Sequence, residues 1–317
     1  MEVNAERLAA IVKAPVENVI RIPGGFSKET FLFDVVRDAG SRERLVLRRD
    51  LPAGPSQTTV VDEFKVLLAV HRAGIPAPEP VFVEPDPSVL GQPFLLMRRV
   101  EGTADAGGKP REVGLELARI LARLHTLDPE KLDAGFGAIP RNAAECANFL
   151  VDHWHAIWLA KKLEPAPILV RAFGWLRANR PKTVSRISLV HTDVGMHNLL
   201  VQGGRIRALL DWEFARVGDP ADDLGYARPQ VEKLLGWDEF LTEYYAHGGP
   251  TYLEQNARWY EIWRSVRNAV CCTAGLAGFV SGENLQVNQA LVGIGLYRQL
   301  CAEIIERIAS EQIRKAS

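Results

Sequence analysis

The sequence has few cysteines, no excess of charge of either sign and no long apolar run. Its four cysteines are irregularly spaced and form no CxxC pair, which argues against a disulfide framework or a cysteine-rich zinc site. Lysine and arginine together number 38, against 39 aspartate and glutamate residues. Charge therefore gives no reason to expect a nucleic acid or an anionic membrane as partner, and we expect small-molecule chemistry in a reducing compartment.

Targeting and membrane segments are also not expected. Glu2 and Glu6 stand where a signal peptide would be positively charged and then apolar. The longest uncharged stretch near the end of the sequence lies between Arg267 and Glu283 and is rich in small residues. It is too short and too polar to span a bilayer. The sequence therefore predicts a cytoplasmic protein.

Two regions of different hydrophobic pattern make up the chain, which at 47% hydrophobic residues can bury a sizeable core. In residues 1–100, short alternating runs predict a small sheet, and helical spacing between Val60 and His71 predicts one long helix. In residues 101–317, helical periodicity dominates. We expect an α+β protein with an N-terminal lobe, a hinge at 101–110 and a C-terminal lobe. The predicted C-terminal helices are 111–127, 143–162, 166–179, 231–247, 254–278 and 286–312.

One segment, 188–215, interrupts these helices and reads as two strands joined by a Gly-Gly turn. If the two glycines centre the turn, Asn198 pairs near Leu209. Asp211 then falls two residues further along the strand, on the same face. That offset is about 7 Å, which an amide and a carboxylate can both bridge through metal ions.

The residue types needed for phosphoryl transfer occur around this hairpin. The reaction requires a carboxylate to orient the attacking hydroxyl, oxygen ligands for Mg²⁺ and a cation near the triphosphate. Asp193, Asn198, Asp211 and Arg48 are of these types. Each one alone has a structural interpretation, as a turn residue or a cap. Their occurrence together favours a catalytic interpretation.

His191-Thr192-Asp193 with Asn198, followed by Leu210-Asp211-Trp212-Glu213, resembles the catalytic loop and metal-binding segment of the aminoglycoside phosphotransferase-like kinases. The run from Gly218 to Leu224 resembles the segment that follows in that family. The resemblance implies a bilobal protein-kinase-like fold, with a small antiparallel-sheet N-lobe that carries one long helix and a larger, mainly helical C-lobe.

The resemblance also implies a function and roles for five residues. The family transfers the γ-phosphoryl group of ATP or GTP to a hydroxyl of a small molecule, with Mg²⁺. By the family's pattern, Asp193 is the catalytic base, and Asn198 and Asp211 are the metal ligands. Asp223 is a structural acid that braces the loop, to which His191 belongs. Thr192 departs from the pattern, because the family usually has glycine at that position.

The predicted nucleotide site lies in the first lobe. Gly24, Gly25, Phe26 and Ser27 form a loop between two strands, whose backbone N–H groups would cover the triphosphate, although Gly-Gly turns are common. The apolar strand from Phe94 to Val100 resembles the family's nucleotide-binding hinge, whose backbone groups would bind the base. These hinge residues are Met97, Arg98, Arg99 and Val100.

Arg48 stands where the family usually presents a lysine to the phosphates. It projects to the side opposite Arg49 by strand alternation, and arginine keeps the charge with a different reach. Glu63 resembles the acidic partner of this cation, and a glutamate that faces solvent is the alternative. A protein kinase is a further alternative, but 221–262 contains no obvious activation segment.

A non-catalytic nucleotide-binding scaffold is a third hypothesis, motivated by Arg48 and Thr192 and opposed by the retained catalytic set. The acceptor is left open. Residues 221–262 carry a formal charge of −5 and many aromatic side chains. This region either favours a cationic or aromatic-stacking alcohol, or its acids face water and its aromatic residues form the core.

Overall fold

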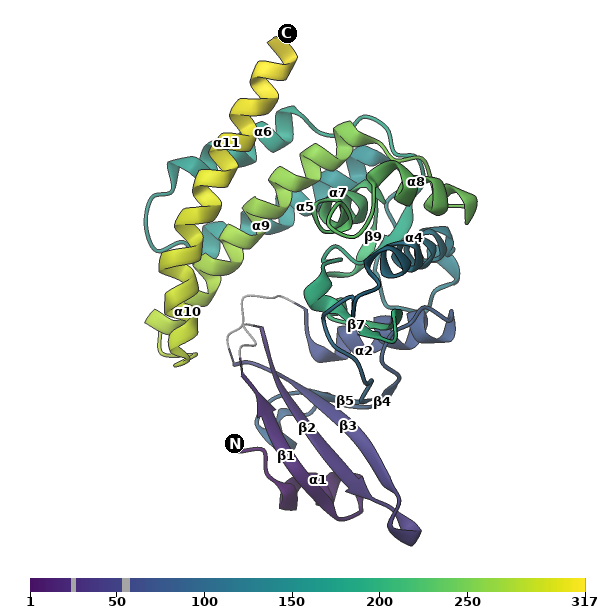
Figure 1. The fold of residues 1–317 in the computed structure, drawn as a ribbon. Helices are drawn as coiled ribbons and strands as arrows, with labels where there is room; N and C mark the ends of the chain where they lie inside the picture. The colour runs from purple at the N-terminus through teal and green to yellow at the C-terminus, as the bar shows by residue number, and fades with distance from the viewer. Residues whose placement is uncertain (24–26, 53–57, 317) are drawn as a thin grey trace.

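The computed structural model describes residues 1–23, 27–52 and 58–316, and the fold has two lobes (Figure 1). Three residues of the predicted triphosphate loop, Gly24, Gly25 and Phe26, lie outside the described residues. Among the described residues, no helix combines the length and the apolar character needed to cross a membrane. The cytoplasmic location and the lobe boundary at residue 100 stay predictions.

The small lobe is a five-stranded antiparallel sheet with the strand order β1-β2-β3-β5-β4. Leu45 and Leu47 in the third strand pack toward the N-terminal helix, whereas Val46 packs toward the large lobe. Alternation along one strand thus divides its side chains between two cores. The elements of this lobe are α1 (Ala5–Val12), β1 (Val16–Ile22), β2 (Lys28–Val36), β3 (Arg42–Asp50), α2 (Val60–Arg72), β4 (Pro80–Glu84), α3 (Pro87–Leu90) and β5 (Phe94–Arg98).

Helix α2 begins with a capping box. The Thr59 hydroxyl accepts the backbone N–H of Asp62 at 3.2 Å, and an Asp62 carboxylate oxygen accepts the backbone N–H of Thr59 at 3.0 Å. Both groups satisfy donors that a helix start leaves open. The cap fixes the first turn, and Glu63 in that turn is 2% exposed. Glu63 therefore does not face solvent.

The large lobe is built around α9, whose side chains Tyr260, Trp263 and Val266 are fully or almost fully buried at helical spacing. Helices α5, α6, α7 and α11 contact it, and Figure 1 shows α9 and α11 side by side. The helices of this lobe are α4 (Pro110–Thr126), α5 (Ala143–Lys161), α6 (Pro167–Ala178), α7 (Ala221–Val231), α8 (Trp237–Ala246), α9 (Glu254–Val280), α10 (Val287–Leu291) and α11 (Tyr297–Ala316).

Two helical predictions differ in detail from the structure. The segment 221–231 forms α7, although the sequence pattern indicates a helix only from residue 231. Pro229 inside the helix and two aspartates in its first turn hide the pattern. The single helix predicted at 286–312 is divided by a π-helical turn at Val292–Leu296, a turn that contains Gly293 and Gly295.

The segment between α6 and α7 forms two small antiparallel sheets. One pairs β6 (Ser188–Val190) with β9 (Arg216–Gly218), and the other pairs β7 (Leu199–Gln202) with β8 (Arg205–Leu209). The second is the predicted hairpin. The pairing of β6 with β9 was not predicted, because each strand has only three residues and alternation cannot be read over so short a run.

Candidate active site

The hairpin places Asn198 where the sequence predicts it, but it does not direct Asp211 as predicted. Leu199 pairs with Leu209, so Asn198 lies near Leu209 as expected, and the backbone N–H of Leu210 donates to the Asn198 carbonyl at 2.8 Å. Asp211 has left the strand, with a φ of +65° in the left-handed region. The prediction that strand alternation places Asp211 on the face of Asn198 was therefore wrong, and a turn at Asp211 sets its direction instead.

That turn is held by a buried tryptophan. Trp212 is 1% exposed, and its indole Nε1 donates to the carbonyl of Leu209 at 2.8 Å. Its ring meets the His191 ring edge-on at a centroid distance of 4.6 Å. Aspartate is one of the few residues other than glycine that adopt the left-handed conformation readily. The sequence Asp211-Trp212 therefore suits a sharp exit from β8.

His191 links this turn to the loop that carries Asp193. Its Nδ1 accepts the backbone N–H of Asp193 at 3.2 Å, and its Nε2 donates to the carbonyl of Leu210 at 2.8 Å. These two partners place a proton on Nε2 and use Nδ1 as an acceptor. One buried imidazole therefore sets the spacing between the segments of Asp193 and Asp211.

Asp193 is surrounded by donors. Asn198 Nδ2 donates to its Oδ2 at 2.8 Å and to its carbonyl at 3.0 Å, and His197 Nε2 lies 3.5 Å from Oδ2. Burial works to raise the pKa of Asp193, but hydrogen bonds from His197 and Tyr226 and the charge of Arg267 lower it well below its ordinary value. Asp193 is therefore a carboxylate at neutral pH, as a group that accepts a proton must be.

The fit of a divalent cation follows from the same contacts. The amide nitrogen of Asn198 faces Asp193, so its carbonyl oxygen is the atom left to act as a ligand, and Asp211 supplies carboxylate oxygen. None of the described residues forms a hydrogen bond with the buried Oε2 of Glu213. Mg²⁺ is commonly held by one or two such protein oxygens together with phosphate oxygens. Burial and the nearby charge of Asp211 raise the pKa of Glu213 to about 8. The oxygen atoms of Asn198 and Asp211 are of the kind that fits Mg²⁺.

Arg48 reaches this region from the small lobe. Its Nη2 lies 3.0 Å from Asp211 Oδ1, and its Nε lies 3.3 Å from Glu63 Oε2. Burial alone would lower the pKa of Arg48, but the charges of Glu63 and Asp211 raise it. Arg49 points to the other side, where it pairs with Glu29. The structure thus places Arg48 and Glu63 together, and their contact with a nucleotide stays a prediction.

Ser27 connects the small lobe to the turn that follows Asp211. Its hydroxyl donates to Oε1 of Glu213 at 2.9 Å, and the Thr58 hydroxyl donates to the Glu213 carbonyl at 2.8 Å. Lys28 is directed into the small lobe, where it pairs with Asp50 at 2.6 Å. Of the four predicted loop residues, the described one therefore lies against the segment of Asp211.

In the 97–100 segment, which is predicted to bind the base, two backbone amides already donate to other backbone carbonyls of the small lobe. The backbone N–H of Arg98 donates to the Glu79 carbonyl, and that of Arg99 donates to the Arg44 carbonyl. The side chain of Arg98 pairs with Glu79 and Glu43 on the surface, and Met97 is buried. Binding of a base at 97–100 would therefore use backbone groups other than these two amides, and Val100 is the next one along the chain.

Asp223 holds the 191–193 loop through its backbone amides. Its Oδ2 accepts the backbone N–H of His191 at 2.8 Å, and its Oδ1 accepts that of Thr192 at 2.5 Å. His125 Nε2, from α4, lies 3.0 Å from Oδ2, and its Nδ1 lies 2.7 Å from the Tyr244 hydroxyl. Burial works to raise the pKa of Asp223, but the bond from His125 and the neighbouring charges lower it.

Sequence reasoning missed this role of His125. No local signal could have found it, because Asp223 lies 98 residues further along the chain. The environment of Thr192 was also not predicted. Its φ is +71°, a conformation that glycine adopts freely and that β-branched residues rarely adopt.

The acidic region 221–262 is not a free acidic surface. Arginines from α4, α7, α9 and α11, and Arg216 in β9, pair with most of its acids, and Trp237 and Phe240 stack on each other with a centroid distance of 5.1 Å. The region therefore gives no support to a cationic acceptor. The paired acids are Asp222, Glu232, Glu239, Glu243, Glu254 and Glu261.

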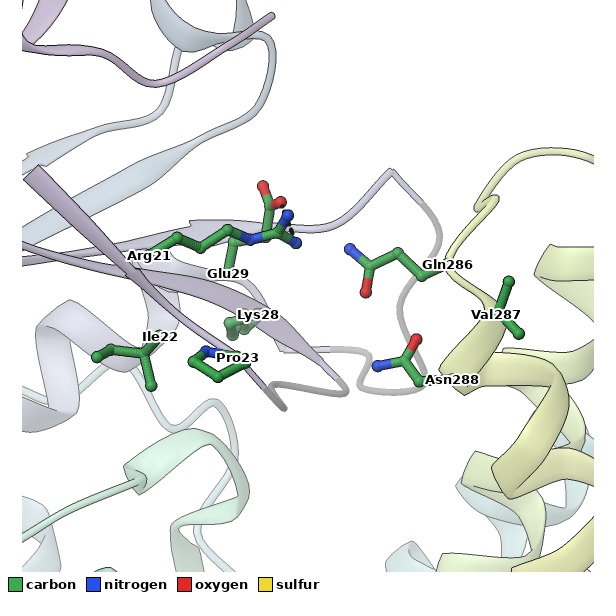
Figure 2. Close-up of a pocket in the computed structure, with 8 residues that line it drawn as sticks. All are labelled: Arg21, Ile22, Pro23, Lys28, Glu29, Gln286, Val287 and Asn288. Carbon is green, nitrogen blue, oxygen red and sulfur yellow. Dashed lines mark ion pairs between the residues drawn. The ribbon is translucent and has the colours of Figure 1, made fainter.

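A separate cavity of about 350 Å³ lies between the lobes, where the ends of β1 and β2 face the segment that enters α10. Figure 2 shows Gln286 and Asn288 directed from the large lobe toward these strands, and Arg21 paired with Glu29 on the opposite wall. None of the residues predicted for catalysis or metal binding lines it. The cavity is therefore distinct from the cluster around Asp193.

The fold is that of known phosphotransferases. A macrolide 2′-phosphotransferase type I superposes with a TM-score of 0.61 at 19% identity, over 88% of this chain and 94% of that one. A thermostable mutant of an aminoglycoside phosphotransferase, in a ternary complex with ADP and hygromycin B, superposes with a TM-score of 0.61 at 17% identity, over 96% and 98%. At these identities the likeness establishes the fold, and it confirms the predicted kinase-like architecture.

Among curated proteins, acyl-CoA dehydrogenase family member 10 of Mus musculus is 31% identical over 205 residues, which are 58% of this chain and 18% of that protein. The chain spans between 18 and 36% of the length of the curated relatives it matches. The model of the phosphotransferase enzyme family matches residues 18–267, a range that contains the hairpin, the catalytic loop and Arg48. The chain therefore belongs to the phosphotransferase enzyme family.

Proposed function

We propose that this protein transfers the γ-phosphoryl group of ATP or GTP to a hydroxyl group of a small molecule, with Mg²⁺. Two contacts support the proposal: Asn198 donates to the carboxylate of Asp193, and Arg48, which comes from the other lobe, pairs with Asp211. A base, two oxygen ligands and a cation are the set that phosphoryl transfer uses. Membership of the phosphotransferase family supports the same reaction.

The proposed step is a direct in-line displacement. Asp193 accepts the proton of the acceptor hydroxyl while the hydroxyl oxygen forms a bond to the γ-phosphorus. The bond between that phosphorus and the β–γ bridging oxygen breaks, and the nucleoside diphosphate leaves with the electron pair. The donors around Asp193 hold its carboxylate in one orientation, which favours a productive approach.

Binding of the nucleotide is assigned to both lobes. Gly24, Gly25, Phe26 and Ser27 would cover the phosphates, Arg48 held by Glu63 would contact them, and the 97–100 segment would bind the base. Asn198 and Asp211 would hold Mg²⁺, which supplies charge neutralisation at the phosphates when it is bound. His191 and Asp223 position the loop.

The acceptor class is the open part of the proposal. Aminoglycosides, macrolides, choline-like alcohols and sugars are candidates, the first two because solved proteins of this fold carry those names. Hydroxylated acyl thioesters belong in the same panel, because the longer curated relatives are named acyl-CoA dehydrogenases. All of these candidates present an alcohol to the same base.

The test is a screen of these alcohols with γ-labelled ATP or GTP and Mg²⁺, read by the mass of the phosphorylated product. We expect one class to gain a phosphoryl group with the wild type and not with Asp193→Asn, which keeps the size of the side chain. General-base loss costs about 10²–10⁴-fold. Tight nucleotide binding without product from any class would overturn the proposal in favour of a nucleotide-binding scaffold.

A further inference from the structure

Thr192 is held in a strained conformation between the two residues that define the catalytic loop. It is fully buried, and its φ of +71° lies in the left-handed region. Such a conformation in a β-branched residue persists only where surrounding contacts impose it. The contacts on Thr192 therefore determine where the next residue, Asp193, is placed.

The side chain of Thr192 makes two of these contacts. Its hydroxyl donates to the Phe214 carbonyl at 3.2 Å and accepts from Nη1 of Arg267 at 3.3 Å. Phe214 ends the turn that begins after Asp211. A glycine at position 192 could not form either bond, although it would adopt the same φ without strain.

Arg267 is an unusual neighbour for this hydroxyl. It is 4% exposed in α9, and its guanidinium lies over the Phe214 ring at 4.2 Å from the centroid. Its Nε donates to the Asn268 side chain at 3.2 Å. Burial lowers the pKa of Arg267. A desolvated cation is costly unless its contacts are specific, and here those contacts reach both the catalytic loop and the turn after Asp211.

We propose that Arg267 is a positioning residue for phosphoryl transfer. It holds Thr192 in the left-handed conformation and so fixes the position of Asp193 relative to the Asp211 segment. This rests on the proposed function, in which Asp193 is the base. Arg267 does not touch the reacting atoms in this arrangement. A glycine at position 192 would adopt this φ without support. Thr192 adopts it because its contact with Arg267 holds it there.

The test is a double-mutant cycle with ATP and Mg²⁺, read as phosphate released to water and as transfer to any acceptor found in the screen. We expect Arg267→Met to lower kcat by about 10–100-fold, the scale of a small misplacement. The KM for ATP should change by less than about threefold. In a Thr192→Gly background the same substitution should cost much less, because glycine needs no support at this φ.

Hydrogen exchange of the 191–195 peptide tests the positioning without any turnover. Arg267→Met and Thr192→Val, which loses both hydroxyl bonds, should each speed its exchange. Arg258→Met, on the same helix but paired with Glu254 and Glu311, should leave exchange and kcat as in the wild type. If Arg267→Met does not fold, Thr192→Val carries the test.

An equal cost of Arg267→Met in both backgrounds, or unchanged exchange in Thr192→Val, would overturn the positioning role. Absence of turnover in the wild type would instead count against the proposed function, and the exchange measurement would still decide the role of Arg267.

Discussion

Nη2 of Arg48 lies 3.0 Å from Oδ1 of Asp211, so a strand of the small lobe and the exit of the catalytic hairpin meet through one ion pair. The same guanidinium faces Glu63, whose side chain is 1% exposed. The Nε atom of Arg48 lies 3.3 Å from Oε2 of Glu63, but the two atoms are not aligned for a hydrogen bond. Arg48 therefore balances two carboxylates at the junction of the lobes.

Loss of this cation should destabilise the protein. Burial raises the pKa of Glu63, and Arg48→Met leaves that buried carboxylate without its partner. Breaking a buried pair from one side costs about 3–5 kcal/mol. Urea unfolding should show such a loss for Arg48→Met and a smaller one for Arg48→Lys, which keeps the charge.

The matched control is the double variant Arg48→Met with Glu63→Gln, in which no buried charge is left unpaired by the change. We expect it to be more stable than the sum of the single costs implies. Additive costs would show that Arg48 and Glu63 do not act as a pair.

Asp211→Asn should remove the metal-dependent part of nucleotide binding. Asparagine tolerates the left-handed conformation, so the turn is kept while the charge is lost. A ligand at 100 times its Kd stabilises by about 2.7 kcal/mol. In a thermal-shift titration with ATP, Mg²⁺ should enlarge the shift for the wild type and should have little effect on the variant. The same gain from Mg²⁺ in both proteins would refute the assignment of Asp211 as a metal ligand.

Much of this arrangement follows from sequence patterns. Strand alternation separates Arg48 from Arg49, and the structure directs them to opposite sides. Helical spacing from Val60 to His71 predicts a helix with Glu63 near its start, and the structure places Glu63 in the first turn. Local periodicity suffices here because both elements are long and regular.

Other features of the site depend on turns and on contacts between distant residues, which the hydrophobic periodicity of the sequence does not predict. Asn198 lies next to the Leu199–Leu209 pair, as expected, but the turn at Asp211 breaks the alternation on which the predicted direction of Asp211 relied. The support of Asp223 by His125 joins residues far apart in sequence. One signal was present for Thr192: a family position usually filled by glycine indicates a positive φ.

Asp223→Asn should impair both stability and catalysis. The two oxygens of Asp223 accept the N–H groups of His191 and Thr192, and an asparagine can accept only with one of its atoms. A buried donor left unsatisfied costs about 1–3 kcal/mol. We expect a loss of this size in urea unfolding and a large loss of kcat, because the loop that carries Asp193 is released.

Tyr244→Phe is the matched control for this prediction. It removes the hydroxyl bonded to His125 at 2.7 Å and leaves both loop amides bonded. A neutral hydrogen bond contributes about 0.5–1.5 kcal/mol. Stability should fall by that amount and kcat should change little. A loss of kcat equal to that of Asp223→Asn would show that the whole buried network, and not the loop amides, supports catalysis.

Asp219 should give the protein a specific pH dependence of stability. It is 1% exposed, accepts the N–H of Ala221 at 2.9 Å and the side-chain amide of Asn256 at 2.6 Å, and its pKa is raised by burial to about 6. Between the ordinary value near 3.8 and 6, the folded state binds more protons than the unfolded state. Stability from this group is therefore present at low pH and is lost as the pH rises.

Comparison with Asp219→Asn isolates this contribution from the other carboxylates. On raising the pH from 5 to 7, the stability of the wild type relative to the variant should fall by about 1 kcal/mol in urea unfolding. The opposite sign would mean that the bonds from Ala221 and Asn256 outweigh burial and hold Asp219 ionised. Because Asp219 lies outside the Asn198 and Asp211 pair, the trend should be the same with and without Mg²⁺ and nucleotide.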